Sequence, residues 1–88
     1  MQRSHYYVYI LLCRDGSLYT GHAKNVERRL EMHKKGRGAR YTRIHEPEKL
    51  VYVEKFESRG EAMRRERQIK TLSHDKKQQL ITNSSKSG

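Results

Sequence analysis

The chain opens with two apolar segments joined by an Asp-Gly turn, and this arrangement leaves few choices for the fold. Residues 5–13 (HYYVYILLC) are rich in aromatic and β-branched side chains and are too short for a typical helix. Asp15-Gly16 between two apolar segments is a strong hairpin pattern, so we expect residues 18–22 to form the returning strand. The fold should therefore contain an antiparallel pair of strands.

The length of the turn decides which side chains share a face of this hairpin. A two-residue loop would pair Leu12 with Tyr19 and would place Tyr19 on the other face from Tyr9. A three-residue loop with Gly16 in the left-handed conformation, as in a G1 bulge, pairs Leu12 with Leu18 instead. We expect this bulged hairpin, because it leaves Tyr9 and Tyr19 together and makes one uninterrupted apolar face. That face consists of Val8, Ile10, Leu12 and Leu18.

A helix, an irregular stretch and a third strand should follow. Asn25 is a good N-cap and Gly36 a good C′ residue, so the first helix should lie between them. Two glycines within residues 34–43 indicate a loop or a broken short helix. Pro47 ends this stretch, and residues 50–56 (LVYVEKF) have the composition of a strand.

Two further helices should complete the fold. Ser58 and Glu61 match the capping-box pattern, which predicts a helix from Ser58 to about Leu72. Ser73 can cap a last helix that ends near Ile81.

The expected elements make one small domain. Their order, β-β-α-β-α-α, predicts an α/β (α+β) fold in which helices flank a three-stranded, mainly antiparallel sheet. A chain of 88 residues is near the lower limit for folding around a single core. We expect residues 1–82 to form this domain and residues 83–88 to be a flexible polar tail.

Composition excludes several classes of protein and favours a polyanion as partner. Cys13 is the only cysteine, which excludes disulfides within the chain and multi-cysteine zinc sites. No apolar run approaches the roughly 20 residues of a membrane helix and no signal-peptide pattern opens the chain, so we expect a cytoplasmic protein with no membrane partner. Lys and Arg total 20 against 10 Asp and Glu, and the net charge of +10 favours nucleic acid.

Glu66 occupies a position that needs a chemical explanation. On the predicted helix, Ala62, Met63 and Ile69 lie on the same side as Glu66 and should face the sheet. A buried carboxylate is costly unless it is paired or binds a cation. Two interpretations stay open: a salt bridge, for which Arg29 is a candidate partner, or a ligand for Mg²⁺, which commonly takes only one or two protein carboxylates.

Tyrosine dominates the aromatic residues, with 6 Tyr, 1 Phe and no Trp. A tyrosine stripe on a strand is ordinarily half-buried sheet surface, and this interpretation suits Tyr6, Tyr7, Tyr41 and Tyr52. Tyr9 and Tyr19 differ because the preferred register brings them together, where a neighbouring arginine or metal would lower the pKa of a phenol toward a useful range. Arg29 on the neighbouring helix is suited to gripping a phosphate.

The order of these residues resembles the GIY-YIG nucleases. Tyr7-Val8-Tyr9 followed by Tyr19-Thr20-Gly21 resembles the paired motifs of that family, with Tyr7 in place of its glycine and Thr20 in place of its isoleucine. Residues 21–30 (GHAKNVERRL) resemble the segment that leads into the family's first helix, and residues 61–70 resemble its glutamate-bearing helix. The resemblance covers about residues 5–72 and is greatest to the short stand-alone bacterial members.

This resemblance implies a metal-dependent endonuclease that hydrolyses phosphodiester bonds, in DNA rather than RNA and of a repair or recombination type. Arg29 falls on the family's catalytic arginine, and Glu66 on its ligand for Mg²⁺ or Mn²⁺. Tyr9 would act as general base, directly or through His33. The implied catalytic residues are Tyr9, Tyr19, Arg29, His33 and Glu66.

Clustered basic residues should bind the phosphate backbone. They are Lys34, Lys35, Arg37, Arg40, Arg43, Arg64, Arg65 and Arg67. We expect a monomer or a weak homodimer. Two other functions fit the charge: a nucleic-acid-binding module that keeps the fold without cleaving, which would not depend on Glu66, and an RNA- or ribosome-associated accessory protein.

Overall fold

The computed structural model describes residues 5–86, and its centre is the predicted three-stranded sheet. Strand β1 (Tyr6–Cys13) lies in the middle. Strands β2 (Leu18–Ala23) and β3 (Pro47–Phe56) pair with it on either side, both antiparallel. The sheet order β2-β1-β3 makes β2 and β3 the two edge strands.

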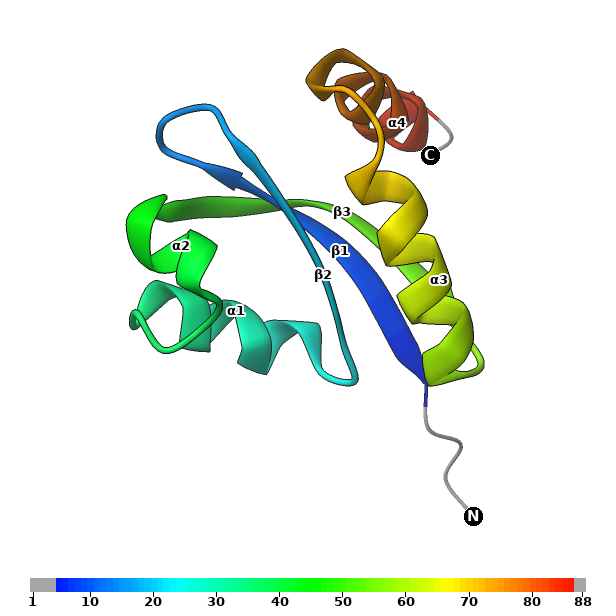
Figure 1. Cartoon of the computed structure of the whole chain (residues 1–88), viewed down its shortest axis with the longest axis horizontal. Helices are drawn as coiled ribbons and strands as arrows, with labels where there is room; N and C mark the ends of the chain where they lie inside the picture. Colours follow the sequence, from blue (N-terminus) through cyan, green and yellow to red (C-terminus); the bar gives the residue numbers. More distant parts are fainter. Residues whose placement is uncertain (1–4, 87–88) are drawn as a thin grey trace.

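Helices cover both faces of this sheet. Helix α1 (Val26–Lys34) and the short helix α2 (Arg40–Ile44) lie on one side, and α3 (Arg59–Lys70) and α4 (His74–Lys86) lie on the other (Figure 1). Helix α2 occupies the stretch for which the sequence predicts a loop or a broken short helix. The α/β (α+β) architecture is therefore confirmed.

The hairpin has the predicted bulged register. Leu12 pairs with Leu18, and Leu11 pairs with Tyr19. Gly16 has φ of 87°, the left-handed conformation that this turn requires and that glycine adopts without strain. Tyr9 and Tyr19 consequently lie on the same face of the sheet.

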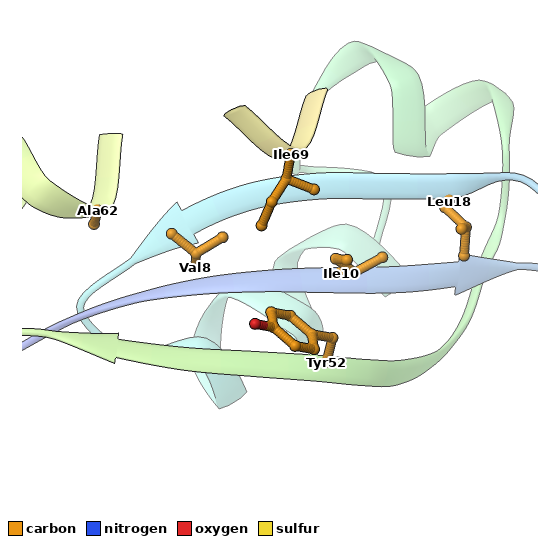
Figure 2. Packing of buried hydrophobic residues seen from close by; sticks show 6 residues of the cluster. All are labelled: Val8, Ile10, Leu18, Tyr52, Ala62 and Ile69. Atoms are coloured by element: carbon orange, nitrogen blue, oxygen red, sulfur yellow. The ribbon is translucent and has the colours of Figure 1, made fainter. Parts of the chain in front are cut away.

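The main core lies between the sheet and α3. Figure 2 shows the residues that form it: Val8, Ile10, Leu18, Tyr52, Ala62 and Ile69. Leu12 packs against this cluster from the hairpin, and Leu80 and Ile81 pack against it from α4. Ala62 and Ile69 are the fully buried side chains of α3, so the predicted inner face of that helix is confirmed.

The opposite face is buried as well, beneath α1 and α2. Tyr9, Leu11 and Cys13 of β1 are at most 1% exposed there, and His33 of α1 is buried with them. Cys13 thus packs as a small apolar residue. This second layer of buried side chains contains the tyrosine and the histidine that the family resemblance singles out.

Side-chain caps begin the helices where the sequence predicts them. Asn25 accepts a hydrogen bond from the Arg28 amide at 3.0 Å, and Ser58 accepts one from the Glu61 amide at 3.2 Å. Ser73 caps α4 by accepting from the Lys76 amide at 3.2 Å.

Two predicted boundaries are wrong. Helix α4 continues past Ile81 to Lys86, so residues 83–86 are helical rather than a flexible tail, and residues 87–88 lie outside the described residues. Polar residues of moderate helix propensity continue this helix because no Pro or Gly interrupts it before position 88. Strand β3 begins at Pro47, earlier than predicted, since the first residue of an edge strand can do without an amide hydrogen. Within residues 5–86, none of the helices is both long and apolar enough to cross a bilayer.

Candidate active site

Tyr9 and Tyr19 meet on adjacent strands. Their ring centroids are 6.2 Å apart and their planes are inclined by 46°. Gly21, which pairs with Tyr9 across the hairpin, makes this approach possible. A Cβ atom at Gly21 would lie 2.7 Å from the Tyr9 hydroxyl and 3.0 Å from the Tyr19 ring. The glycine of the second motif therefore provides the space in which the two phenols gather.

His33 connects Tyr9 to the end of the site that lies under α2. The Tyr9 hydroxyl is 2.9 Å from Nε2 of His33, whose Nδ1 is 2.6 Å from Thr42 Oγ1. Thr42 in turn donates its hydroxyl hydrogen to the Ala39 carbonyl at 2.9 Å. Since Thr42 donates onward, it accepts from Nδ1–H of His33, which leaves Nε2 as the acceptor for the Tyr9 hydroxyl. The chain of hydrogen bonds thus has one direction, from Tyr9 through His33 to the backbone.

Arg29 brings a positive charge to the two phenols. It projects from α1, and its guanidinium opposes the effects that raise the pKa of Tyr9. The Nε atom of Arg29 is buried and, within the part of the chain that the structure describes, has no hydrogen-bond partner. A buried donor without a partner is unfavourable. An anionic oxygen bound beside Tyr9 would supply that partner.

Glu66 points to the β2 edge of the sheet and is only 17% exposed. Its two carboxylate oxygens lie 2.5 Å from His22 Nδ1 and 2.8 Å from Lys70 Nζ. Arg29, the candidate partner for a salt bridge, forms no ion pair with Glu66 among the described residues. Lys70 pairs with Glu66 instead, because it follows one turn later on the same helix. Burial raises the pKa of the Glu66 carboxyl, but hydrogen bonds and charges from Lys70 and His22 outweigh it and hold the pKa below its usual value.

The pKa values of the two phenols, Tyr9 and Tyr19, lie above the ordinary value of a tyrosine rather than below it. Burial raises the pKa of Tyr9, with a further contribution from Tyr19, and the lowering effect of Arg29 is smaller. Burial likewise raises the pKa of Tyr19. Arg29 lowers the pKa of both phenols, as predicted for a neighbouring arginine, but burial outweighs it. The sequence does not reveal how completely α1 and α2 enclose the rings. Each phenol is therefore a proton donor at neutral pH.

Glu66 offers a single carboxylate to a divalent ion, and His22 and Lys70 already bind its two oxygens. The described residues contain no group of three or more His, Cys, Asp or Glu side chains placed to hold a metal. Mg²⁺ does not need such a group, because it commonly binds one or two carboxylates and keeps several waters. Glu66 would be the carboxylate, and a bound ion would compete with Lys70 for it.

The predicted nucleic-acid-binding residues fall into two groups. Lys34, Lys35, Arg37, Arg40 and Arg43 are exposed around α2, on the side of the sheet that holds Tyr9 and His33. The arginines of α3 are divided: Arg64 and Arg67 are exposed, whereas Arg65 is half-buried and paired with Glu54 of β3 at 3.3 Å. Since β3 is the edge opposite β2, Arg65 faces away from Glu66.

Three residues of the site do not follow from the sequence argument. The Glu66–Lys70 pair has the i, i+4 spacing that could have indicated it. His22 directly follows Gly21, but only the packing of α3 on β2 brings it to Glu66. Thr42 carries no sequence signal, because its role depends on the position of a five-residue helix.

The buried imidazole makes stability depend on pH. Burial, with a contribution from Arg29, lowers the pKa of His33 below its ordinary value of 6.5. The neutral ring therefore contributes stability that is full above about pH 6.5 and is lost as the pH falls through the lowered pKa of the folded protein. Between about pH 7.5 and 5.5, the thermal midpoint of the wild type should fall more steeply than that of His33→Gln. If the thermal midpoints of the two proteins fall equally with pH, His33 does not determine the pH dependence of stability in this range.

Comparison with known proteins identifies a family and several relatives. The family model of the GIY-YIG catalytic domain matches residues 5–79. A UPF0213 protein of Staphylococcus saprophyticus is 52% identical over 77 residues, which cover 88% of this chain and 94% of that protein. A UPF0213 protein of Staphylococcus aureus is 51% identical over 76 residues, which cover 86% of this chain and 93% of that protein.

Two solved structures share the fold. The solution NMR structure of a UPF0213 protein from Bacillus halodurans is 50% identical, with a TM-score of 0.57, and covers 89% of this chain and 83% of that one. The solution NMR structure of a protein from E. faecalis is 40% identical, with a TM-score of 0.63, and covers 92% of this chain and 86% of that one. The chain therefore belongs to the GIY-YIG family, a family of endonuclease-type hydrolases, and its close relatives are UPF0213 proteins.

Proposed function

We propose that this protein is a metal-dependent endonuclease that hydrolyses phosphodiester bonds in DNA, in a repair or recombination role. The observation that carries the proposal is the directed hydrogen-bond chain from Tyr9 through His33 to Thr42, next to Arg29, whose buried Nε atom has no hydrogen-bond partner among residues 5–86. Attack of water on a phosphodiester requires a proton acceptor beside a group that can bind the anionic phosphate.

The proton of the attacking water leaves through Tyr9. As the water oxygen forms its bond to phosphorus, the bond from phosphorus to the leaving oxygen breaks, and that oxygen takes up a proton from solvent. The proton of the attacking water passes to the Tyr9 oxygen while the Tyr9 hydroxyl proton passes to Nε2 of His33. This coupled transfer avoids a free phenolate, which the raised pKa of Tyr9 disfavours. The resulting imidazolium keeps its Nδ1–H bond to Thr42, which holds the ring in place during the transfer.

Arg29 and Tyr19 bind the phosphate. A guanidinium binds non-bridging oxygens through a rigid pair of N–H donors, and a protonated phenol adds an O–H donor. Charge builds up on these oxygens in the transition state, so donors fixed in advance favour it over the bound substrate. A Mg²⁺ or Mn²⁺ ion held by Glu66 would supply further stabilisation of the phosphate and of the leaving oxygen.

A cleavage assay tests this function. Purified protein should nick at least one member of a set of duplex, flap and branched DNA in the presence of Mg²⁺ or Mn²⁺, and EDTA should abolish the product. An RNA version of each substrate decides between DNA and RNA. Binding without cleavage on every substrate, in either metal, would favour the non-catalytic binding module.

The exposed basic residues around α2 should supply phosphate contacts for either nucleic acid. Arg40→Ala and Arg43→Ala should weaken binding to all sequences alike, and each should reduce the slope of log affinity against log salt by about 1. Arg65→Ala is the matched control, because its side chain is paired with Glu54 at the opposite edge. Equal slopes for all three variants and the wild type would place the phosphate contacts elsewhere.

A further inference from the structure

Strand β3 forms one edge of the sheet, and within residues 5–86 it pairs with β1 alone. The outer side of an edge strand presents backbone N–H and C=O groups that can pair with another strand. Val53 is 43% exposed on this strand, and Glu48, Lys49 and Lys55 are exposed as well. A strand added here would extend the sheet on the side opposite Glu66, which lies at the β2 edge.

The sequence of β3 is complementary to itself. Residues 48–55 read EKLVYVEK. Two copies of this segment can pair antiparallel about a two-fold axis that passes between Val51 and Tyr52. Opposite charges then face each other at both ends and apolar side chains face each other in the middle, which are favourable cross-strand pairs. The pairs are Glu48–Lys55, Lys49–Glu54, Leu50–Val53 and Val51–Tyr52, and each occurs twice in the pair of strands.

A bulge in β3 makes this register possible. Side chains that lie opposite each other on antiparallel strands share a face of the sheet, so the members of each pair must also share a face within one copy. Leu50 and Val53 do so although they are three positions apart, because β3 has an extra residue between them opposite β1. Both line the groove beside α1. Lys49 and Glu54 share the other face of the sheet for the same reason.

The charges of β3 favour this register over its neighbours. Moving one strand by two residues would place Glu48 opposite Val53 or opposite Glu57. Charged residues on an edge strand ordinarily prevent pairing, but here each meets an opposite charge. The chain has a net charge of +10, whereas residues 48–55 contain two Glu and two Lys. Two copies can therefore approach at this strand without local repulsion.

A groove between α1 and β3 supplies apolar contacts for the same pairing. It has a volume of about 440 Å³, and its apolar lining consists of Tyr7, Val26, Leu50 and Val53. Pairing would bring Leu50 and Val53 of both copies together beside the axis. Burial of these branched side chains favours association.

We infer that this protein forms a two-fold homodimer in which the β3 strands of two copies pair to give one continuous six-stranded antiparallel sheet. The interface is isologous, because the same residues contribute from both copies. A two-fold axis perpendicular to a sheet leaves each face on its own side, so both candidate active sites would lie on the same side of the combined sheet. The inference does not depend on the proposed hydrolysis.

Sedimentation equilibrium without DNA or metal tests it by charge reversal. The wild type should show a reversible equilibrium between monomer and dimer. Glu48→Lys and Lys55→Glu each place like charges opposite each other, and each substitution acts twice in a two-fold interface. Each should therefore weaken dimerisation at least about tenfold. Both side chains are exposed, so neither substitution disturbs the core.

A mixture of the two variants makes the test specific to this register. Position 48 of each variant then faces an opposite charge at position 55 of the other, so the mixture should form a heterodimer with a dissociation constant within about threefold of the wild-type value. Glu31→Lys makes the same charge change at an exposed position of α1 and should dimerise as the wild type does. A wild type that stays monomeric up to millimolar concentration would overturn the inference. Single variants that dimerise normally, or a mixture that does not recover dimerisation, would overturn it as well.

Discussion

Glu66→Gln should reduce the rate of phosphodiester cleavage roughly a hundredfold to a thousandfold, the loss typical of removing one group that stabilises transition-state charge. The substitution keeps the shape of the side chain and its hydrogen-bonding capacity toward His22, but removes the negative charge that would hold a divalent ion. The ion pair with Lys70 is also lost. Because Lys70 is half-exposed, that pair should contribute no more than about 1 kcal/mol to stability.

The matched control is Glu61→Gln, the same chemical change at an exposed position in the first turn of the same helix. Single-turnover rates at saturating Mg²⁺, with Kd for the same DNA, separate catalysis from binding. We expect Glu61→Gln to cleave at the wild-type rate and Glu66→Gln to bind as the wild type does. If Glu66→Gln cleaves normally, the metal lies elsewhere or is not required.

Gly38→Ala should displace the His33 ring from its position in the candidate active site. A Cβ atom at Gly38 would lie 2.0 Å from Nδ1 and 2.6 Å from Cε1 of His33, far inside contact distance. The ring is 1% exposed and cannot swing into solvent, so it must shift away from Tyr9 or Thr42. Forcing extra volume into a packed site typically costs about 1–3 kcal/mol. We expect this loss in urea unfolding, together with a cleavage rate at least about tenfold lower because proton transfer depends on exact placement.

Gly60→Ala is the control for this substitution. A Cβ atom at Gly60 meets nothing within 4 Å, and the residue lies in the first turn of α3. Alanine there should leave cleavage unchanged and raise stability by up to about 1 kcal/mol. Wild-type stability and activity for Gly38→Ala would mean that His33 is not held as tightly as the structure indicates.

Most of the fold follows from local sequence rules. The bulged hairpin is predictable because only one turn length places the apolar side chains on one face of the sheet and both Tyr9 and Tyr19 on the other. Helix starts are predictable because Asn25, Ser58 and Ser73 each cap through their own side chain. The end of α4 is not, because helix ends without a glycine or proline depend on packing by residues such as Leu80.

A residue of the candidate site is predictable only where the sequence of its own helix or strand is enough to identify it. Glu66 can be found because a carboxylate on the apolar side of its helix conflicts with the pattern around it. The bond from Tyr9 to His33 joins residues 24 positions apart and needs the placement of α1 on the sheet. Thr42 and the raised pKa of Tyr9 likewise depend on α2, whose five residues carry little signal of their own.

The central claim is that groups from separate elements act on a single phosphate. Kinetic constants for Tyr9→Phe, Glu66→Gln and the double variant test it most directly, on one substrate and at one pH. Groups that act as a unit in one step are strongly non-additive, so the double variant should be no more than severalfold slower than the slower single variant. Losses that simply multiply, with each substitution acting as if the other were absent, would contradict the account.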